Sequence, residues 1–210
     1  MNVHILNKLF GFVMNICRKH NIDESHGLSH SMKVLHYAHE IYETEKLLEP
    51  VLKEHEKIIY ISSVLHDMCD KKYMSEIDGL IEIEKLIEEY ITEEEKEIIL
   101  KIISTMSYST VKKNGFPELG IYQTAYHCVR EADLLTAYDF DRCLIYDMYS
   151  KDNTFEKTFE KAETLFKERV FKHSDDKLLT MKYSLAVYPT LHLNAMNRIK
   201  IWKNILKIPP

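Results

Sequence analysis

A histidine and an aspartate stand side by side at positions 66 and 67, directly after the apolar run of residues 58–65. Burying either side chain without a partner is costly, so both must be satisfied where that run enters the core. Neighbouring side chains on a helix diverge by roughly 100°. Both can therefore reach one point only if that point lies between their two directions. A bound ion meets this requirement, so His66 and Asp67 are predicted to share a metal ion.

Two other polar residues lie on apolar helical stripes. His30 precedes Val34 by one turn on the same face, and Asp133 follows Val129 by one turn. Because the helical period places such residues on one side of the helix, His30 and Asp133 are expected to face the interior.

Together the inward groups form a set of two imidazoles and two carboxylates, contributed by His30, His66, Asp67 and Asp133. Such a nitrogen and oxygen set suits one divalent ion, which we expect to be Mn, Mg, Fe, Co, Ni or Zn. An ion held in this way lowers the pKa of its water and attracts phosphoryl oxygens. The alternative is that each residue is a hydrogen-bonded structural residue of the core, but three separate stripes broken by metal-type residues favour the ion.

The elements that must position these residues are predicted to be helices, because apolar residues recur every three or four positions almost throughout the chain. Thr92 followed by Glu95 has the form of a capping box. Residues 107–120 are expected to form a long loop, and Pro189 is expected to kink or split the last helix. The expected helices cover residues 3–19, 28–46, 53–68, 77–90, 93–107, 121–138, 140–151, 155–172 and 177–206.

Bulk properties argue against several classes of protein. Twenty-eight basic and 33 acidic residues give a net charge of -5 without a basic block, so no nucleic-acid polymer is expected as a partner. Four cysteines without metal or disulfide spacing favour a reducing compartment, and we expect the cytoplasm. No segment approaches the roughly 20 apolar residues that a membrane span needs, so no membrane association is expected.

The order of the polar residues, His30, then His66-Asp67, then Asp133, resembles the H…HD…D signature of the HD-domain superfamily of metal-dependent phosphohydrolases. The flanking segments agree with that family. DESHGLSHSMKV resembles its D-x-x-H-D/G-x-x-H-x-x-R/K-V opening, LHDMCDKKY resembles L-H-D-I-G-D-R-K-Y, READLLTAY resembles its D-A-D-x-L segment, and IISTMSYS resembles a stretch between the HD pair and the last aspartate.

The resemblance covers residues of about 20–145 and implies an all-α, HD-type helical bundle with the metal site in the bundle core. We expect one domain over residues 1–210, in which C-terminal helices within 155–206 complete the bundle. No linker signal interrupts the chain, which agrees with this expectation.

The resemblance also implies a role for each matching residue. His30, His66, Asp67 and Asp133 would be the metal ligands. Asp67 and Asp70 would be the catalytic carboxylates. Asp70 would orient a water molecule or a residue that contacts a metal ligand, and either carboxylate could accept the proton of the attacking water.

Beside the ligands, His26 matches the family's preceding histidine, and Lys71 and Lys72 match a basic pair suited to substrate phosphates. An ammonium group is a good point charge for phosphate, so His26, Lys71 and Lys72 are the expected substrate-binding residues. Ordinary solvation is the alternative for the two lysines. Glu131 is the alternative to Asp70 as the general base.

Three residues depart from the family pattern: Cys69 replaces a glycine, Leu134 a frequent arginine and Thr136 a frequent aspartate. These departures affect the expected substrate preference and leave the ligand set intact. Dinuclear members of the family need further histidines before the last aspartate, where this chain offers only His127. That residue points away from the face of Asp133 by about 240°, so one metal ion is expected.

These features predict a metal-dependent phosphohydrolase that acts on a small phosphorylated substrate, expected to be a nucleotide, at a phosphomonoester or pyrophosphate bond. The alternative is a catalytically silent HD domain that serves as a nucleotide- or protein-binding module. An oxygen-using di-iron enzyme is disfavoured by the shortage of histidines, and a helical adaptor would leave the buried polar residues unexplained. The apolar last helix, which contains Trp202, either packs inside its own chain or pairs two chains. Core packing is the more common role of such a stripe, and a homodimer is left open.

Overall fold

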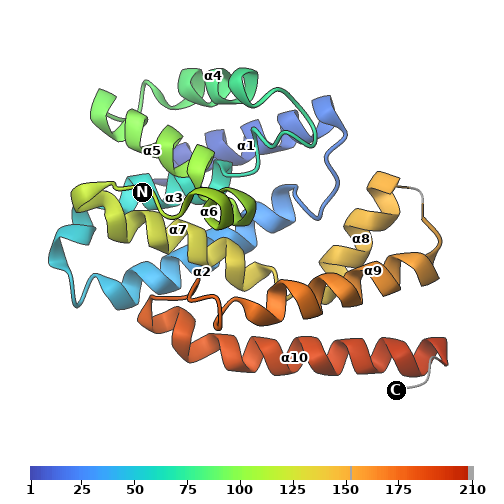
Figure 1. Cartoon of the computed structure of the whole chain (residues 1–210). Helices are drawn as coiled ribbons and strands as arrows, with labels where there is room; N and C mark the ends of the chain where they lie inside the picture. The colour runs from blue at the N-terminus through green and yellow to red at the C-terminus, as the bar shows by residue number, and fades with distance from the viewer. Residues whose placement is uncertain (152, 208–210) are drawn as a thin grey trace.

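The computed structural model describes residues 1–151 and 153–207. This part of the chain forms ten α-helices and three short 3-10 helices and contains no strand, which confirms the predicted all-α class (Figure 1). The α-helices are α1 (Val3–His20), α2 (Leu28–Glu45), α3 (Glu56–Leu65), α4 (Glu76–Ile87), α5 (Glu93–Thr105), α6 (Tyr108–Asn114), α7 (Gln123–Thr136), α8 (Phe140–Lys151), α9 (Phe155–Glu168) and α10 (Lys182–Leu206). The 3-10 helices are η1 (Pro50–His55), η2 (Gly120–Tyr122) and η3 (Val170–Lys172).

The centre of the bundle is α3, which packs against α1, α2, α5 and α7. Every residue from Ile58 to Leu65 is buried, because this helix is apolar or carries only small hydroxyl groups on all sides. Its end at Leu65 brings the next residues, His66 and Asp67, into the interior. Helices α2 and α7 lie against each other and against α3, so three helices meet at the point where α3 ends.

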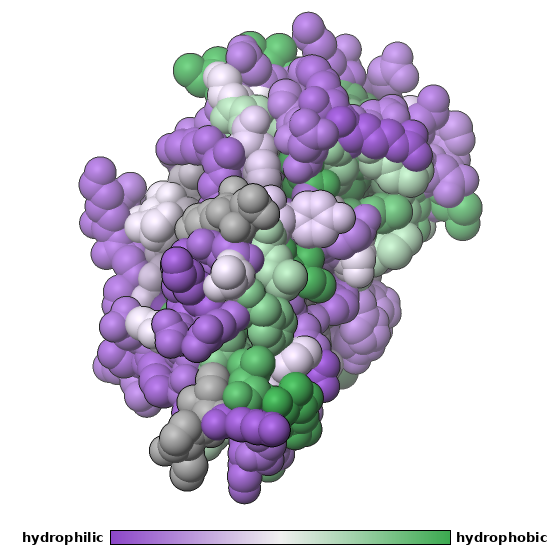
Figure 2. Space-filling model, turned by 90° about the vertical axis from the view of Figure 1, so that its right-hand side faces the viewer, coloured by the Kyte–Doolittle hydropathy of each residue, from purple (hydrophilic) through white to green (hydrophobic). Residues whose placement is uncertain are grey.

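The C-terminal helices α8, α9 and α10 enclose a second group of buried apolar side chains, which includes Phe140, Phe159, Phe166 and Ile199. In Figure 1, α10 runs as a long rod along α9 at the lower edge of the molecule. Figure 2 views the side on which α8 and the end of α10 lie and shows apolar surface between hydrophilic side chains. None of the described helices is both long enough and apolar enough to cross a membrane.

The capping box at Thr92 is confirmed: its side chain accepts from the Glu95 amide, and the Glu95 side chain accepts from the Thr92 amide. The expected loop at residues 107–120 is wrong in its first half, which forms α6. The Ser107 side chain caps this short helix by accepting from the Thr110 amide, and buried Val111 fastens it to the core. Tertiary packing thus outweighs the weak helical signal of a seven-residue segment.

The last helices also differ from the expected bounds. Helix α9 ends at Glu168 and is followed by η3, and α10 begins at Lys182 instead of residue 177. The expectation of a split at Pro189 is wrong, because α10 runs through this residue as one helix. Pro189 lies on the exposed face of α10, where water can hydrate the carbonyl that loses its hydrogen bond.

Candidate metal centre

Three of the predicted ligands converge from three separate segments. His30 comes from α2, His66 follows α3 directly, and Asp133 comes from the last turn of α7. One ligand atom of each lies within 4.8 Å of the others. The Nε2 atom of His30 is 3.1 Å from Nε2 of His66 and 3.4 Å from Oδ1 of Asp133. This buried group confirms that His30, His66 and Asp133 could hold one metal ion together.

Asp67 adjoins the two imidazoles of this group. Its Oδ2 atom is 3.2 Å from Nε2 of His30 and 3.3 Å from Nε2 of His66. The same oxygen is buried and has no hydrogen-bond partner. The charge of this oxygen is balanced by the adjacent imidazoles, and a metal ion between them would balance it directly. The residues present therefore fit a cation.

The outer nitrogens of the two histidine rings have different partners. Nδ1 of His66 is 2.9 Å from the carbonyl oxygen of Ser63 and donates to it, which turns Nε2 toward the cluster. Nδ1 of His30 is 2.6 Å from a guanidinium nitrogen of Arg142, which lies 3.2 Å from Nε2 of the same ring. A guanidinium only donates hydrogen bonds, so Arg142 competes with a metal ion for the lone pair of the His30 ring, whichever nitrogen carries that lone pair.

The electrostatics of the site favour an added positive charge. Burial acts to raise the pKa of Asp67, but the neighbouring histidines hold that pKa well below its ordinary value. The pKa of Asp133 is also lowered, because His30 and His66 outweigh the effect of burial. Burial acts to lower the pKa of His66, but the Asp67 and Asp133 carboxylates raise it to about 9. Two ionised carboxylates thus attract either a proton on His66 or a metal cation.

The cluster opens into a cavity of about 340 Å³, which we call the metal-side cavity. His66, Asp67 and Asp133 form part of its wall. The other residues predicted for the site also reach this wall, as do two arginines and the start of α6. They are His26, Asp70, Lys71, Lys72, Ser107, Tyr108, Arg142 and Arg169.

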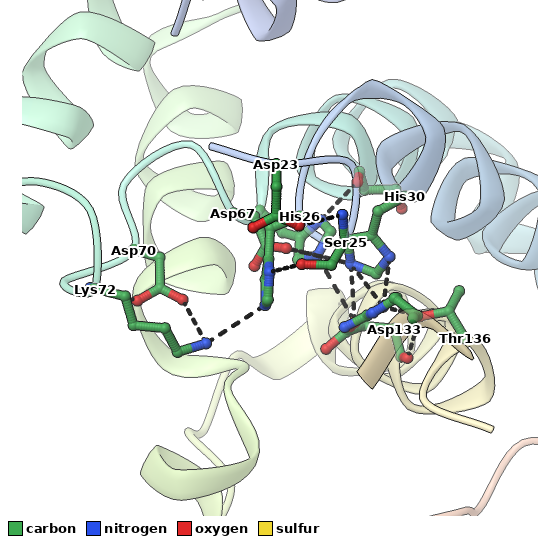
Figure 3. Close-up of polar contacts among 12 residues, drawn as sticks. Asp23, Ser25, His26, His30, Asp67, Asp70, Lys72, Asp133 and Thr136 are labelled. Atoms are coloured by element: carbon green, nitrogen blue, oxygen red, sulfur yellow. Dashed lines mark hydrogen bonds and ion pairs between the residues drawn. The ribbon is translucent and has the colours of Figure 1, made fainter. Parts of the chain in front are cut away.

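Figure 3 shows Lys72 between Asp70 and His26. The Lys72 ammonium lies 3.1 Å from Oδ2 of Asp70 and 3.5 Å from Nε2 of His26. Oδ1 of Asp70 accepts from the Lys72 amide at 2.9 Å. Nδ1 of His26 is 2.8 Å from the Ser25 hydroxyl, and burial lowers the pKa of His26 to about 4. Asp70 and neutral His26 therefore position Lys72, whereas Lys71 is exposed and pairs with Glu76.

The residues that sequence reasoning missed are Arg142 on α8 and Arg169 just after α9. The Arg142 guanidinium donates to the Thr136 hydroxyl at 2.9 Å, and Thr136 in turn donates to the Asp133 carbonyl. The Arg169 guanidinium lies over the Tyr108 ring at 4.0 Å. No local pattern distinguishes either arginine from the other basic residues of the chain, so only the packing of α8 and α9 identifies them.

Glu131, the other candidate for the general base, lies away from the metal-side cavity. Its carboxylate accepts from the amides of Thr180 and Met181 at 2.8 and 3.1 Å and pairs with buried Arg130. It is fully buried and fastens the segment before α10 to α7. Its contacts are structural.

Two of the three departures from the family pattern have clear packing roles. Cys69 is buried against Gly79, where an added Cβ would lie 2.6 Å from the Cys69 Cβ. Burial raises the pKa of Cys69 to about 12, so this side chain is a neutral filler. Leu134 belongs to a small apolar group with Val111 and Leu178.

His127 is not part of the candidate metal group. Its Nε2 atom is 3.2 Å from the Gln123 amide, and its Nδ1 atom accepts from Arg130 at 3.1 Å. Burial lowers the pKa of His127 to about 4. The described residues thus contain one candidate group of metal ligands in this region, and the expectation of a single ion stays a prediction.

No family model, curated protein or solved structure matches this chain. The resemblance to the HD superfamily is therefore supported by the sequence motifs and by an all-α structure with buried His30, His66 and Asp133. Membership of that superfamily stays a prediction.

Proposed function

We propose that the chain is a metal-dependent phosphohydrolase of the HD type, which acts on a small phosphorylated substrate, expected to be a nucleotide. The observation that supports this function is the position of a buried imidazole and carboxylate cluster at the wall of a cavity with several cations. Those cations are Lys71, Lys72, Arg142 and Arg169. A divalent ion and a phosphate are the pair of ligands that such a combination suits.

His30, His66 and Asp133 would hold the ion, and Asp67 would complete the set with its buried Oδ2 atom. The ion would be Mn, Mg, Fe, Co, Ni or Zn, and it would supply Lewis-acid activation of a phosphoryl oxygen and of the attacking water. For His30 to bind the ion, the Arg142 guanidinium would have to move away from the imidazole ring.

The other polar groups of the cavity would bind and orient the phosphate. Lys72 and Arg142 offset its negative charge, and the fork of a guanidinium matches two phosphoryl oxygens. Asp67 is better placed than Asp70 to accept the proton of the attacking water, because Asp70 uses both oxygens to hold Lys72. Asp70 and His26 then act as positioning residues for Lys72.

A second candidate is a catalytically silent domain that binds a phosphorylated ligand. The contact between Arg142 and His30 favours this candidate, because the arginine lies against both imidazole nitrogens, one of which a metal would need. In this case the cations of the cavity would bind the ligand, and the acidic cluster would balance their charge.

The test is release of phosphate and pyrophosphate from nucleoside mono-, di- and triphosphates with Mn²⁺, Mg²⁺, Co²⁺ or Ni²⁺. The double variant His66→Ala, Asp67→Ala is the inactive comparison, and His36→Ala, Asp78→Ala at two exposed positions is its matched control. Turnover that is lost only in the first double variant supports the phosphohydrolase. Intact nucleotide that binds but survives long incubation with each metal supports the silent domain. Equal turnover in both double variants would refute the assigned site.

The location in the cytoplasm, the single-domain organisation and a homodimer stay predictions. Trp202 lies partly buried at the C-terminal end of α10, where its indole nitrogen donates to Asp141 at 2.8 Å and its ring packs on Phe155. These contacts account for Trp202 within one chain, and an interface between two chains is not needed to explain it.

A further inference from the structure

A second cavity of about 400 Å³ lies between α8 and α9. Four of its lining residues also line the metal-side cavity: His26, Lys72, Arg142 and Arg169. The two cavities therefore meet at a rim made of these four side chains. Three of them carry a positive charge, whereas burial keeps His26 neutral at ordinary pH.

Beyond this rim the lining changes in character. It is formed mainly by apolar side chains and by the ring of Tyr146. The apolar residues are Ala137, Cys143, Ala162, Leu165 and Val170. Flat aromatic or aliphatic groups are the ligands that such walls bind best, because they gain from leaving water and lose no hydrogen bonds.

Two charged residues, Asp147 and Lys161, also line this second cavity. Asp147 is largely occupied within the protein, since its Oδ2 atom accepts from Asn153 at 2.7 Å and from Thr158 at 3.1 Å. Lys161 lies 3.6 Å from the same oxygen, and its side chain is half exposed at the edge. Their charges balance, so the second cavity does not select a strongly charged group.

The Arg169 guanidinium is held at the rim by stacking on Tyr108 of α6, and Arg142 is held by Thr136 of α7. Both arginines thus lie at the boundary between a charged cavity and an apolar one. A molecule with a phosphate at one end and an uncharged flat group at the other would satisfy both sides.

We propose that the second cavity receives the organic part of the substrate, an uncharged aromatic or apolar group, while the phosphate lies at the rim in front of the metal centre. This inference rests on the proposed function and narrows its substrate class to phosphorylated compounds that carry a bulky, uncharged organic group. Substrates that are charged along their whole length, such as inorganic pyrophosphate, would use only the metal-side cavity.

Leu165 offers the test position, because it lines the second cavity on α9 and is 39% exposed, so that a larger side chain has room to fold. Leu165→Trp would fill part of this cavity and leave the predicted metal ligands unchanged, and binding of inorganic phosphate reports any effect on the neighbouring arginines. Leu193→Trp, at an exposed position of α10, is the matched control.

Two ligands with the same reacting ester, adenosine 5′-monophosphate and ribose 5-phosphate, separate the roles of the two cavities. We measure kcat and KM for both, and we measure binding of adenosine 5′-monophosphate and of inorganic phosphate by calorimetry. Leu165→Trp is expected to weaken binding and kcat/KM for adenosine 5′-monophosphate by about tenfold or more. Values for ribose 5-phosphate and inorganic phosphate should stay unchanged, as should every value of Leu193→Trp.

The outcomes distinguish this inference from the proposed function. If adenosine 5′-monophosphate binding weakens selectively in Leu165→Trp but no ligand is hydrolysed, the second cavity is supported and the phosphohydrolase is refuted. If hydrolysis occurs and Leu165→Trp affects adenosine 5′-monophosphate and ribose 5-phosphate equally, the second cavity does not receive the organic group. The inference is also overturned if Leu165→Trp behaves like Leu193→Trp in every measurement.

Discussion

Replacing Arg142 by methionine is expected to tighten metal binding while it removes turnover. One guanidinium nitrogen of Arg142 lies 2.6 Å from Nδ1 and 3.2 Å from Nε2 of His30. A neutral imidazole has a single lone pair, so His30 cannot accept from Arg142 and bind a metal through Nε2 at once. Methionine keeps an unbranched apolar stem at this position but has no hydrogen to donate.

The magnitude follows from the contact that the metal must break. A hydrogen bond with a charged donor contributes about 1.5–3 kcal/mol. Each 1.4 kcal/mol corresponds to about a tenfold change in a dissociation constant, so Arg142→Met is expected to lower the Kd for a divalent ion by about 10- to 100-fold. Removing a positive charge beside the ion acts in the same direction.

The assay is calorimetric titration of Mn²⁺ into both proteins, with phosphate release measured in parallel. Arg198→Met is the control, because this arginine is half exposed and pairs with Asp141 outside the metal-side cavity. The wild type and Arg198→Met should share one Kd. An unchanged or weaker affinity in Arg142→Met would refute the argument that Arg142 competes with the metal for His30, and full turnover in that variant would refute the role of Arg142 in phosphate binding.

Three further predictions concern protons and buried charge. The pKa of His66 is about 9, so metal binding should release a proton from this histidine below that pH. Calorimetry should then show the Kd for Mn²⁺ falling about tenfold per pH unit from pH 7 to 9, and a Kd that does not change with pH contradicts this. His173 is fully buried with both nitrogens unpartnered, and burial lowers its pKa to about 4. The unfolded chain thus binds more protons at this histidine below about pH 6.5, so His173→Phe should reduce the loss of stability that urea unfolding detects toward pH 4. The rest of that loss stays with His26 and His127, whose pKa values burial also lowers to about 4. Glu131→Gln leaves Arg130 uncompensated and should lower the free energy of unfolding by about 3–5 kcal/mol; a loss below about 1 kcal/mol would contradict that role.

The sequence by itself determined the helical class and the inward direction of the ligands. A helical period places each residue on one face of its own helix, so His30 and Asp133 could be assigned to the interior before the helices were packed. The apolar run of α3 likewise predicted that His66 and Asp67 would enter the core at its end. These features depend on local periodicity and are readable along the chain.

Only the tertiary structure decided which cations face the metal centre. Arg142 and Arg169 lie on elements that follow the recognisable motifs, and their positions depend on how α8 and α9 pack against α7 and α6. Helix α6 was missed for a related reason, since buried Val111 and the Ser107 cap stabilise a segment too short to signal a helix alone. Long side chains reach a site from many points of the sequence, and the packing of helices selects among them because it sets distances that periodicity does not contain.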